Sequence, residues 1–472
     1  MNGLKKNILY SSFYQVFSIL IPLITTPYVS RALGIEGIGR YSYAYSIAYY
    51  FVIFAMLGVN NYGNRTIARV RNDKEELSKA FCGIYAFQAL TSLIVIGIYL
   101  VYISIFSDDK IISSIMLVYV VSAGIDINWL FYGLEKFKLI VFRSTLVKIF
   151  TITGVLLFVR KPADIYVYCM IYVLGMLLSQ VIVWPFVFGM ITFRRVSMQE
   201  IKKHIKPDLL LFMPVIAVSL YKFMDKIMLG YISSRAEVGY YESCEKIIQV
   251  PNLLVSALST VMLPRISNLV SLHNDEKGMS YFNKSIAFSM FLSCSLSFGI
   301  MGVSEEFVPF FYGFGFEKCV LLFQILAPSC LFVALNNVMG TQYLIPHKKD
   351  KIYLFSVITG AAINLILNIL LIPYMDSSGA AIATLVAEMM VCIVQCIHIK
   401  DKIDFIQQIK SLVLFFVPGF IMYFVLINIQ LDIKNMIFHL IAKIIIGAFV
   451  YIVSMAFLRF LFVVFHISYG IR

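Results

Sequence analysis

The sequence predicts an all-α polytopic membrane protein with about 14 transmembrane helices. Of its 472 residues, 60% are apolar and only 14% are charged, whereas soluble domains are about half apolar and about one quarter charged. The apolar residues fall into runs long enough to cross a bilayer, which takes about 20 residues. This composition excludes a soluble enzyme, a soluble nucleic-acid-binding protein and a disordered protein.

Runs of about 18 or more apolar residues define the spans. In chain order they lie near 8–30, 38–59, 80–106, 111–133, 139–159, 163–190, 208–231, 237–263, 282–303, 318–345, 351–373, 377–399, 411–430 and 436–465. No connection exceeds about 20 residues, so the chain has no room for a soluble catalytic domain.

The first run is expected to be a retained helix and not a signal peptide. Lys5 and Lys6 precede it, as in a signal peptide. The run is too long for a signal-peptide core, however, and it meets Arg31 instead of a cleavage site with small residues.

The basic residues predict the orientation. With the N-terminus inside, the cytoplasmic set holds 24 Lys and Arg: both tails and the segments near 60–79, 134–138, 191–207, 264–284, 346–351 and 400–410. The outer set holds 8: the segments near 31–40, 107–110, 160–162, 232–236, 304–318, 374–376 and 431–435. This threefold bias follows the positive-inside rule and predicts that both termini are cytoplasmic.

Seven basic and five acidic residues remain within the spans. They are Arg143, Lys148, Lys222, Lys226, Lys246, Lys443 and Arg459, with Asp126, Asp225, Glu242, Glu245 and Glu388. Exposing all twelve to lipid would cost on the order of 35 kcal/mol, at about 3 kcal/mol for each charge. Several must therefore face one another or a wet interior.

An offset of 200 residues indicates an internal repeat. It aligns Gly39 with Gly239, Tyr41 with Tyr241, Ile47 with Ile247 and Arg65 with Arg265. A weaker match links Tyr132, followed by Lys136 and Lys138, to Tyr343, followed by Lys348 and Lys349. We therefore expect an N-lobe over 1–190 (helices 1 to 6), a basic cytoplasmic linker over 191–207, a C-lobe over 208–400 (helices 7 to 12) and two further helices over 401–472. Secondary transporters are built from such repeated bundles.

Several segments resemble those of Wzx-type polysaccharide flippases. The segment from Pro27 to Tyr41, PYVSRALGIEGIGRY, resembles the family's Pro-x3-Arg-x-Leu-Gly-x4-Gly-x-Tyr pattern. Further likenesses are Asn64-Arg65, the segment WLFYGLE from Trp129 to Glu135, and GTQYLIP from Gly340 to Pro346. Together these segments cover helices 1 to 12.

The resemblance implies the fold of the multidrug/oligosaccharidyl-lipid/polysaccharide exporter superfamily, in which two six-helix lobes form a V around a central cavity. It implies flipping of undecaprenyl-diphosphate-linked oligosaccharide repeat units across a bacterial inner membrane, for O-antigen, capsule or exopolysaccharide synthesis. Membrane lipid, a polymerase and a chain-length regulator are the other partners it suggests; nucleic acid, cofactor and metal are not expected.

Such a cargo carries a diphosphate and many hydroxyls. Fixed cations within the spans would lower the cost of moving the diphosphate, and the candidates are Arg143, Lys148, Lys222 and Lys226. Lys222 and Lys226 share a helix face, and Asp225 offers them an internal ion pair as the alternative. Arg31, Arg65 and Arg265 lie near span ends, where they are either substrate contacts or topology anchors.

The remaining candidates are acids and amides. Asp126 and Glu388 have no basic partner within their own helical turn, so we expect one of them, or Asp225, to take part in proton or sodium coupling. Asn364 and Asn368 lie one turn apart and suit either a polar cavity wall or helix packing.

Two other function classes stay open. A drug or metabolite cation antiporter of the same fold would favour an anionic cavity, whereas the spans here hold more basic than acidic residues. A polysaccharide polymerase or ligase would need a long external loop, and the longest, near 304–318, is short. The chain has no GxSxG, HExxH or Walker A motif and no CxxC pair among its eight cysteines.

Overall fold

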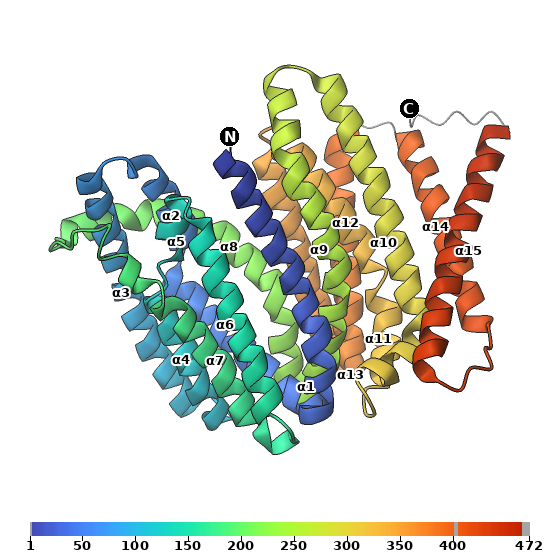
Figure 1. Cartoon of the computed structure of the whole chain (residues 1–472), viewed down its shortest axis with the longest axis horizontal. Helices are drawn as coiled ribbons and strands as arrows, with labels where there is room; N and C mark the ends of the chain where they lie inside the picture. Colours follow the sequence, from blue (N-terminus) through green and yellow to red (C-terminus); the bar gives the residue numbers. More distant parts are fainter. Residues whose placement is uncertain (1, 401–404, 465–472) are drawn as a thin grey trace. The chain divides into compact units, whose positions relative to one another are not determined.

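The computed structural model describes residues 2–400 and 405–464, and it divides the chain into two compact units, residues 1–227 and 228–472 (Figure 1). The described residues form helices and no strand, which confirms the predicted all-α class. The division falls within one helix, α8, and the lobe boundaries expected from the sequence stay a prediction.

Unit 1 is built from helices, most of which are joined by short connections. These are α1 (Asn2–Met56), α2 (Val59–Val70), α3 (Lys74–Ile105), α4 (Lys110–Gly124), α5 (Asn128–Gly133), α6 (Phe137–Phe158), α7 (Ile165–Val181) and most of α8 (Met198–Ile232), with the 3-10 turns η1 (Pro162–Asp164) and η2 (Trp184–Phe186).

Unit 2 is also helical. Its elements are α9 (Arg235–Ser271), α10 (Asp275–Phe311), α11 (Lys318–Leu326), α12 (Ser329–Asn337), the π-helical turn η3 (Val338–Leu344), α13 (Asp350–Ile399), α14 (Phe405–Asn428) and α15 (Met436–Val464).

Among the described residues, 11 helices are long and apolar enough to cross a membrane, or 12 if a bent pair within α8 is one span. Two of them, Ile21–Val70 and Asp350–Ile399, are 50 residues long. At 1.5 Å per residue, each is more than twice as long as the roughly 30 Å bilayer core is thick. Each is therefore long enough for two crossings, but the number of 14 stays a prediction.

Non-helical residues interrupt both long helices. Gly34 has φ 67° in α1, and Asp376 has φ 50° in α13. Positive φ is readily adopted by glycine but is strained for aspartate. Side-chain caps mark other helix starts as sequence rules expect: Asp73 accepts from the N–H of Glu75 at 2.8 Å, and Ser234 accepts from the N–H of Glu237 at 3.3 Å.

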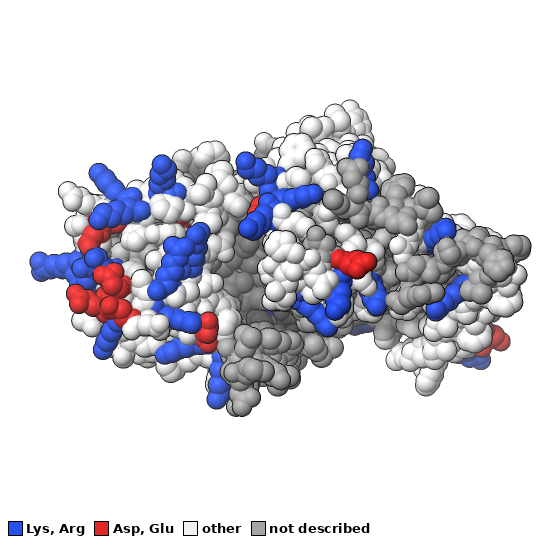
Figure 2. Space-filling view, turned by 90° about the horizontal axis from the view of Figure 1, so that it is seen from above, with Lys and Arg blue, Asp and Glu red and all other residues white. Residues whose placement is uncertain are grey.

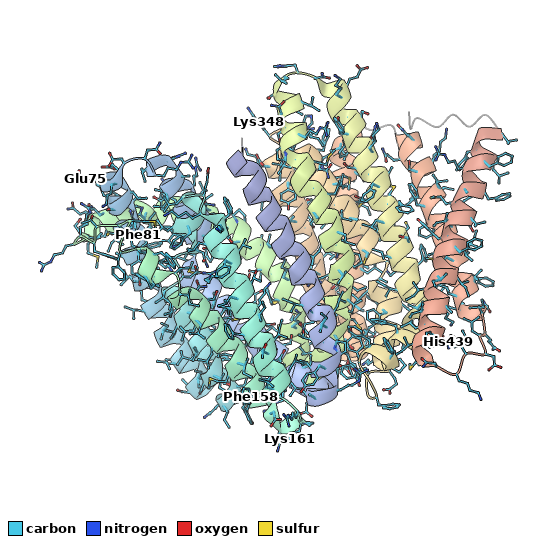
Figure 3. All side chains as sticks on the ribbon, viewed as in Figure 1. Glu75, Phe81, Phe158, Lys161, Lys348 and His439 are labelled. Carbon is cyan, nitrogen blue, oxygen red and sulfur yellow. The ribbon has the colours of Figure 1, made fainter. Side chains whose placement is uncertain are left out.

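The two ends of unit 1 carry different segments. Lys and Arg side chains stand at many points of one end, with fewer Asp and Glu (Figure 2). Glu75 lies at this end, and Lys161 lies at the opposite one (Figure 3). The Tyr62 hydroxyl lies 2.8 Å from His204 Nδ1, so the basic segment 191–207 joins α2 at the same end as Glu75. Residues 160–162 thus lie at the end opposite to the segments 60–79 and 191–207, as expected, and the assignment of the cytoplasmic end stays a prediction.

One helix in each unit ends with the same hydrogen-bond pattern, which supports the internal repeat. Glu135 after α5 and Lys348 after η3 both have positive φ, 56° and 57°. In each case the following N–H bonds to the carbonyl five positions back, Lys136 to Phe131 at 2.9 Å and Lys349 to Leu344 at 2.8 Å. Such a helix ending satisfies carbonyl groups at the end of the helix. It occurs at the segments that begin at Trp129 and at Gly340, both of which resemble segments of the flippase family.

This register differs slightly from the one that the sequence suggested. The N–H of Leu134 bonds to Leu130, and the N–H of His347 bonds to Tyr343 in the same way. Tyr343 therefore corresponds to Leu130 and not to Tyr132. The tyrosine match was accidental, although the segments themselves correspond.

The last two helices are part of the core of unit 2. Leu414, Phe415 and Leu426 of α14 belong to the same buried apolar cluster as Met290 and Phe298 of α10. The Tyr451 hydroxyl of α15 also donates to the carbonyl of Phe291 in α10 at 3.2 Å. Residues 401–404 and 465–472 of this expected appendage lie outside the described residues.

Candidate functional site

A buried arginine organises a polar cluster inside unit 1. Arg143 of α6 is only 6% exposed. Its Nη1 donates to Asn128 Oδ1 at 2.8 Å, and Asn128 Nδ2 donates to Gln180 Oε1 of α7 at 3.1 Å. The cluster thus joins α5, α6 and α7 through side chains that can bond both anions and hydroxyls.

Asp126 belongs to the same cluster. It lies at the break between α4 and α5, where its Oδ1 accepts from the backbone N–H of Asn128 at 2.9 Å. Asn128 therefore links the carboxylate of Asp126 to the guanidinium of Arg143, which is 17 residues away in the chain. Because Asp126 and Arg143 lie far more than one helical turn apart in the chain, the local sequence pattern does not show that they are linked.

Gln88 holds the break in place. Its Nε2 donates to the carbonyls of Ala123 and Asp126, at 2.7 and 2.8 Å, and its Oε1 accepts from Trp129 Nε1 at 3.0 Å. Carbonyls at a helix end lack helical partners, and this glutamine satisfies two of them. Gln88 is not among the site residues predicted from the sequence, although a glutamine within an apolar span is a recognisable signal.

The charged residues of α8 are placed differently from one another. Asp225 and Lys226 are buried, whereas Lys222 is exposed. Lys226 Nζ lies 5.3 Å from the centre of the Phe223 ring, and that ring packs at 4.1 Å against Tyr49. A cation over an aromatic face is stabilised electrostatically. The expected shared face of Lys222 and Lys226 thus does not give them a common environment.

In unit 2, two amide-bearing pairs are buried. Glu388 Oε2 of α13 accepts from Asn336 Nδ2 of α12 at 2.7 Å. Asn368 Nδ2 donates to Asn364 Oδ1 at 3.1 Å, within α13. The two asparagines therefore bond each other, as either packing or a polar wall would allow.

The other predicted site residues lie nearer the surface. Arg31 and Arg65 are exposed, and Lys148 is half-buried. Arg31 Nη1 donates to the carbonyl of Pro27 at 3.1 Å. Arg265 is also exposed, and its Nη2 donates to the Tyr281 hydroxyl at 2.6 Å.

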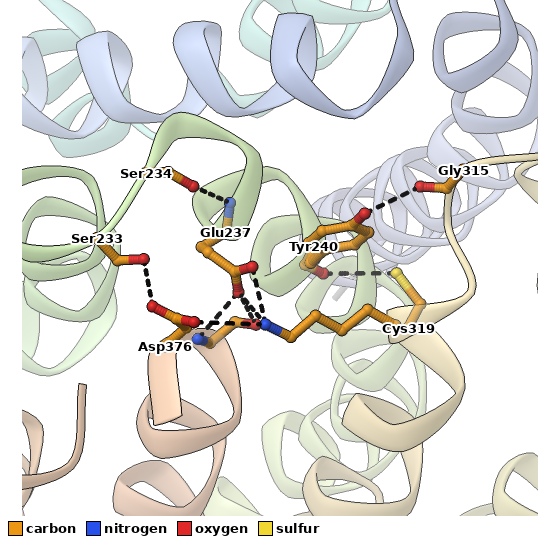
Figure 4. A network of polar contacts seen from close by, with 9 residues as sticks. Ser233, Ser234, Glu237, Tyr240, Gly315, Cys319 and Asp376 are labelled. Atoms are coloured by element: carbon orange, nitrogen blue, oxygen red, sulfur yellow. Dashed lines mark hydrogen bonds and ion pairs between the residues drawn. The ribbon is translucent and has the colours of Figure 1, made fainter. Parts of the chain in front are cut away.

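Two interhelical ion pairs were not predicted from the sequence. In unit 1, Arg40 Nη2 lies 2.5 Å from Asp109 Oδ2. In unit 2, Lys318 Nζ lies 2.7 Å from Glu237 Oε2, within a network that includes Ser233, Asp376 and Ser377 (Figure 4). Lys443, counted among the charges within spans, pairs with Glu306. In all three pairs the partners lie 69 to 137 residues apart in the chain, so no local sequence pattern indicates them.

The polar groups of these clusters can bind anions and hydroxyls. The clusters offer guanidinium, ammonium, amide and carboxylate groups among apolar helices. Within residues 2–400 and 405–464, no three His, Cys, Asp or Glu side chains are grouped so that they could hold a metal ion. Charged groups inside a membrane are costly and commonly mark a transport pathway.

Comparisons with known proteins agree with these features. Residues 4–270, more than half of the chain, match the family described as "Polysaccharide biosynthesis protein". A relative from Escherichia coli (strain K12), named "Putative O-antigen transporter", is 24% identical over 409 residues, covering 85% of this chain and 97% of that protein.

Solved structures show the fold. The lipid II flippase MurJ in an inward closed conformation superposes with a TM-score of 0.79 at 18% identity, covering 96% of this chain and 99% of that one. An inward-facing multidrug resistance MATE family transporter of the MOP superfamily gives 0.57 at 12% identity, covering 81% and 98%. The resemblance to Wzx-type polysaccharide flippases is confirmed, and the chain belongs to the polysaccharide biosynthesis protein family.

Proposed function

We propose that this multi-pass membrane protein moves undecaprenyl-diphosphate-linked oligosaccharide repeat units from the cytoplasmic to the outer leaflet of a bacterial inner membrane. The cargo would serve O-antigen, capsule or exopolysaccharide synthesis, and a polymerase and a chain-length regulator would act on it afterwards. Membership of the polysaccharide biosynthesis family and the name of the Escherichia coli relative support this assignment.

The observation that carries the proposal is the buried cluster around Arg143. A guanidinium held by Asn128 at 2.8 Å within apolar helices is a costly feature unless it is used. Its planar fork suits a phosphate oxygen pair, and the amides of Asn128 and Gln180 suit sugar hydroxyls. An anionic, hydroxyl-rich head group matches this set better than a cationic drug does.

The other candidates extend this site. We propose that Arg31, Arg65, Arg265, Lys148, Lys222 and Lys226 contact the diphosphate at successive stages, and that Asn364 and Asn368 contact sugar hydroxyls. The N-lobe over 1–190 and the C-lobe over 208–400 would rock about the site in alternating access. The basic end of unit 1 would face the cytoplasm, as would both termini.

Transport would be coupled to an ion gradient through a buried acid. Asp126 lies beside the Arg143 cluster, and Glu388 bonds Asn336 at 2.7 Å. Protonation or sodium binding at such a carboxylate would change its pairing and bias the conformations of its helices. Asp225, buried beside Lys226, is the third candidate.

The test is delivery of lipid-linked repeat units to the outer leaflet in the native host. Deletion of the gene should trap these units on the cytoplasmic face, and the wild-type gene should restore polymer formation. Arg143→Gln should lower the rate of delivery about tenfold or more, since a charge-assisted hydrogen bond is worth about 1.5–3 kcal/mol. Arg459→Gln, which removes an exposed arginine of α15, is the matched control.

Normal delivery after deletion, in a strain without a second flippase, would contradict the assignment. The alternative is a drug or metabolite cation antiporter, which the MATE-like fold and the buried Glu388 favour. It predicts altered resistance to cationic drugs in the deletion strain with unchanged polymer.

A further inference from the structure

A pocket in unit 1 brings together two arginines that are distant in the sequence. It has a volume of about 490 Å³ and is lined by Ile24, Pro27, Tyr28, Arg31 and Ala32 of α1 together with Arg160, which follows α6. Ligand pockets typically measure about 300–1,000 Å³. The pocket is therefore large enough for a lipid head group.

The position of Arg160 is fixed by its surroundings. The Tyr28 hydroxyl of α1 lies 2.7 Å from the carbonyl of Val159 and 3.1 Å from that of Leu156, so it ties α1 to the last turn of α6. The backbone N–H groups of Arg160 and Lys161 donate to Asp164 Oδ2 at 2.9 and 3.1 Å. This tight turn engages Oδ2 of Asp164, and Arg160 lines the pocket.

The lining is amphipathic. The guanidinium groups of Arg31 and Arg160 supply positive charge, while Ile24, Pro27 and Ala32 supply an apolar wall. Ile24 is 68% exposed, so the apolar side is open and can meet a hydrocarbon chain. Arginine forks bind phosphate oxygens in pairs, and neither a free sugar nor a cation would need this combination.

The pocket lies at the end of unit 1 that is opposite to the basic segments. Phe158 and Lys161, which flank the Arg160 turn, mark this end in Figure 3, and Glu75 marks the other. The cluster around Arg143 lies between α5, α6 and α7 and shares no residue with the pocket. The two sites are thus separate places for an anion along the same unit.

We propose that this pocket binds the phosphate ester of a lipid, with Arg31 and Arg160 on the phosphate and Ile24 beside the start of the hydrocarbon chain. That the lipid is a polyprenyl diphosphate rests on the proposed function. That it carries a phosphate rests only on the lining of the pocket. In the transport cycle the pocket would hold the head group on the outer side after crossing. Arg160 is a binding residue that the sequence did not single out.

The test measures lipid binding to the full-length protein in nanodiscs by native mass spectrometry. The probes are undecaprenyl diphosphate, undecaprenol, which lacks phosphate, and phosphatidylglycerol. Arg160→Gln and Arg31→Gln should each weaken undecaprenyl diphosphate binding about tenfold. Lys161→Gln removes the same charge one residue away but outside the pocket lining, and it should leave binding unchanged. Thermal melting of each variant checks that it folds.

The outcomes separate the possibilities. If phosphatidylglycerol binds with the same dependence on Arg31 and Arg160, the pocket is supported and its phosphate comes from a membrane phospholipid. Equal binding of undecaprenol and undecaprenyl diphosphate would overturn the proposal, as would an equal loss in all three variants. If the arginine dependence holds but delivery of repeat units does not need the protein, the pocket stands and the proposed function fails. If Arg160→Gln and Arg31→Gln bind undecaprenyl diphosphate as the wild type does, and the wild type flips repeat units, the pocket proposal fails and the proposed function stands.

Discussion

Lys318 donates to both carboxylate oxygens of Glu237, at 2.8 and 2.7 Å, and so ties the first turn of α11 to the first turn of α9. Ser377 of α13 adds its N–H at 3.1 Å and its hydroxyl at 2.5 Å to the same carboxylate. In unit 1, Arg40 of α1 and Asp109, which caps α4, form a comparable pair with the charges exchanged. In each unit, therefore, an ion pair links two helices.

Breaking the pair in unit 2 should destabilise the protein. Glu237→Gln and Lys318→Ala should each cost about 1–2 kcal/mol, since a partly buried charged hydrogen bond exceeds a surface ion pair. The measurement is the melting temperature of the purified protein in detergent. The double variant should lose less than the sum of the single losses. Lys434→Ala, at an exposed position, should have no effect; additive losses would show that the pair does not act as a unit.

Asp376 combines strain with a useful contact. Its φ of 50° is unfavourable for a side chain, but its Oδ1 accepts from the Ser233 hydroxyl at 2.6 Å. Asp376→Gly loses the contact and relieves the strain, whereas Asp376→Ala loses the contact and keeps the strain. We expect the alanine variant to melt below the glycine variant, by about 1 kcal/mol in stability. The reverse order would mean that the left-handed backbone is not strained.

Gly63 is required by close packing. A Cβ at this position would lie 2.6 Å from Cε3 of the buried Trp129 ring, so Gly63→Ala should force the helices apart at a cost of about 1–3 kcal/mol. Gly97→Ala is the matched control, because nothing lies within 4 Å of its Cβ. Thermal melting should separate the two variants, and equal stability would show that Trp129 moves freely.

Variants of Gln88 and of its partner Trp129 should lower the melting temperature to different extents. Trp129→Phe removes one hydrogen bond and part of a fully buried ring, whereas Gln88→Met removes the same hydrogen bond and leaves the carbonyls of Ala123 and Asp126 without their donor. Because unsatisfied buried carbonyls cost about 1–3 kcal/mol each, the methionine variant should melt well below the phenylalanine one. Similar melting temperatures would mean that other groups satisfy these carbonyls.

The coupling proposal predicts a loss of gradient dependence. Asp126→Asn and Glu388→Gln remove a titratable group while keeping size and much of the hydrogen bonding. One of them should abolish stimulation of transport by a proton or sodium gradient in proteoliposomes, while downhill exchange persists. Asn336→Ala should weaken coupling if Glu388 is the carrier, since Asn336 orients its carboxylate. Retained gradient-driven activity in both acid variants would remove these two residues from the coupling scheme.

The sequence by itself determined the class of the protein and its family. The apolar runs and the segment from Pro27 to Tyr41 act locally, and the all-α class and the family that they predict are confirmed. The orientation predicted from the basic residues stays a prediction. Helix caps such as Asp73 and Ser234, which were not among the predictions, are local in the same sense, because a cap bonds within its own turn. The class and these local features depend only on residues that are neighbours in the chain.

Only the tertiary structure decided which polar groups meet. Asn128 and Gln180 lie 52 residues apart, and Tyr28 and Val159 lie 131 apart, yet each pair is hydrogen-bonded. In a soluble helix the apolar stripe shows which face packs. Helices in lipid are apolar on the packed and the exposed face alike, so the pattern does not tell the two faces apart. The partners of Arg143 and the pocket beside Arg160 therefore follow from helix packing, which the linear sequence does not display.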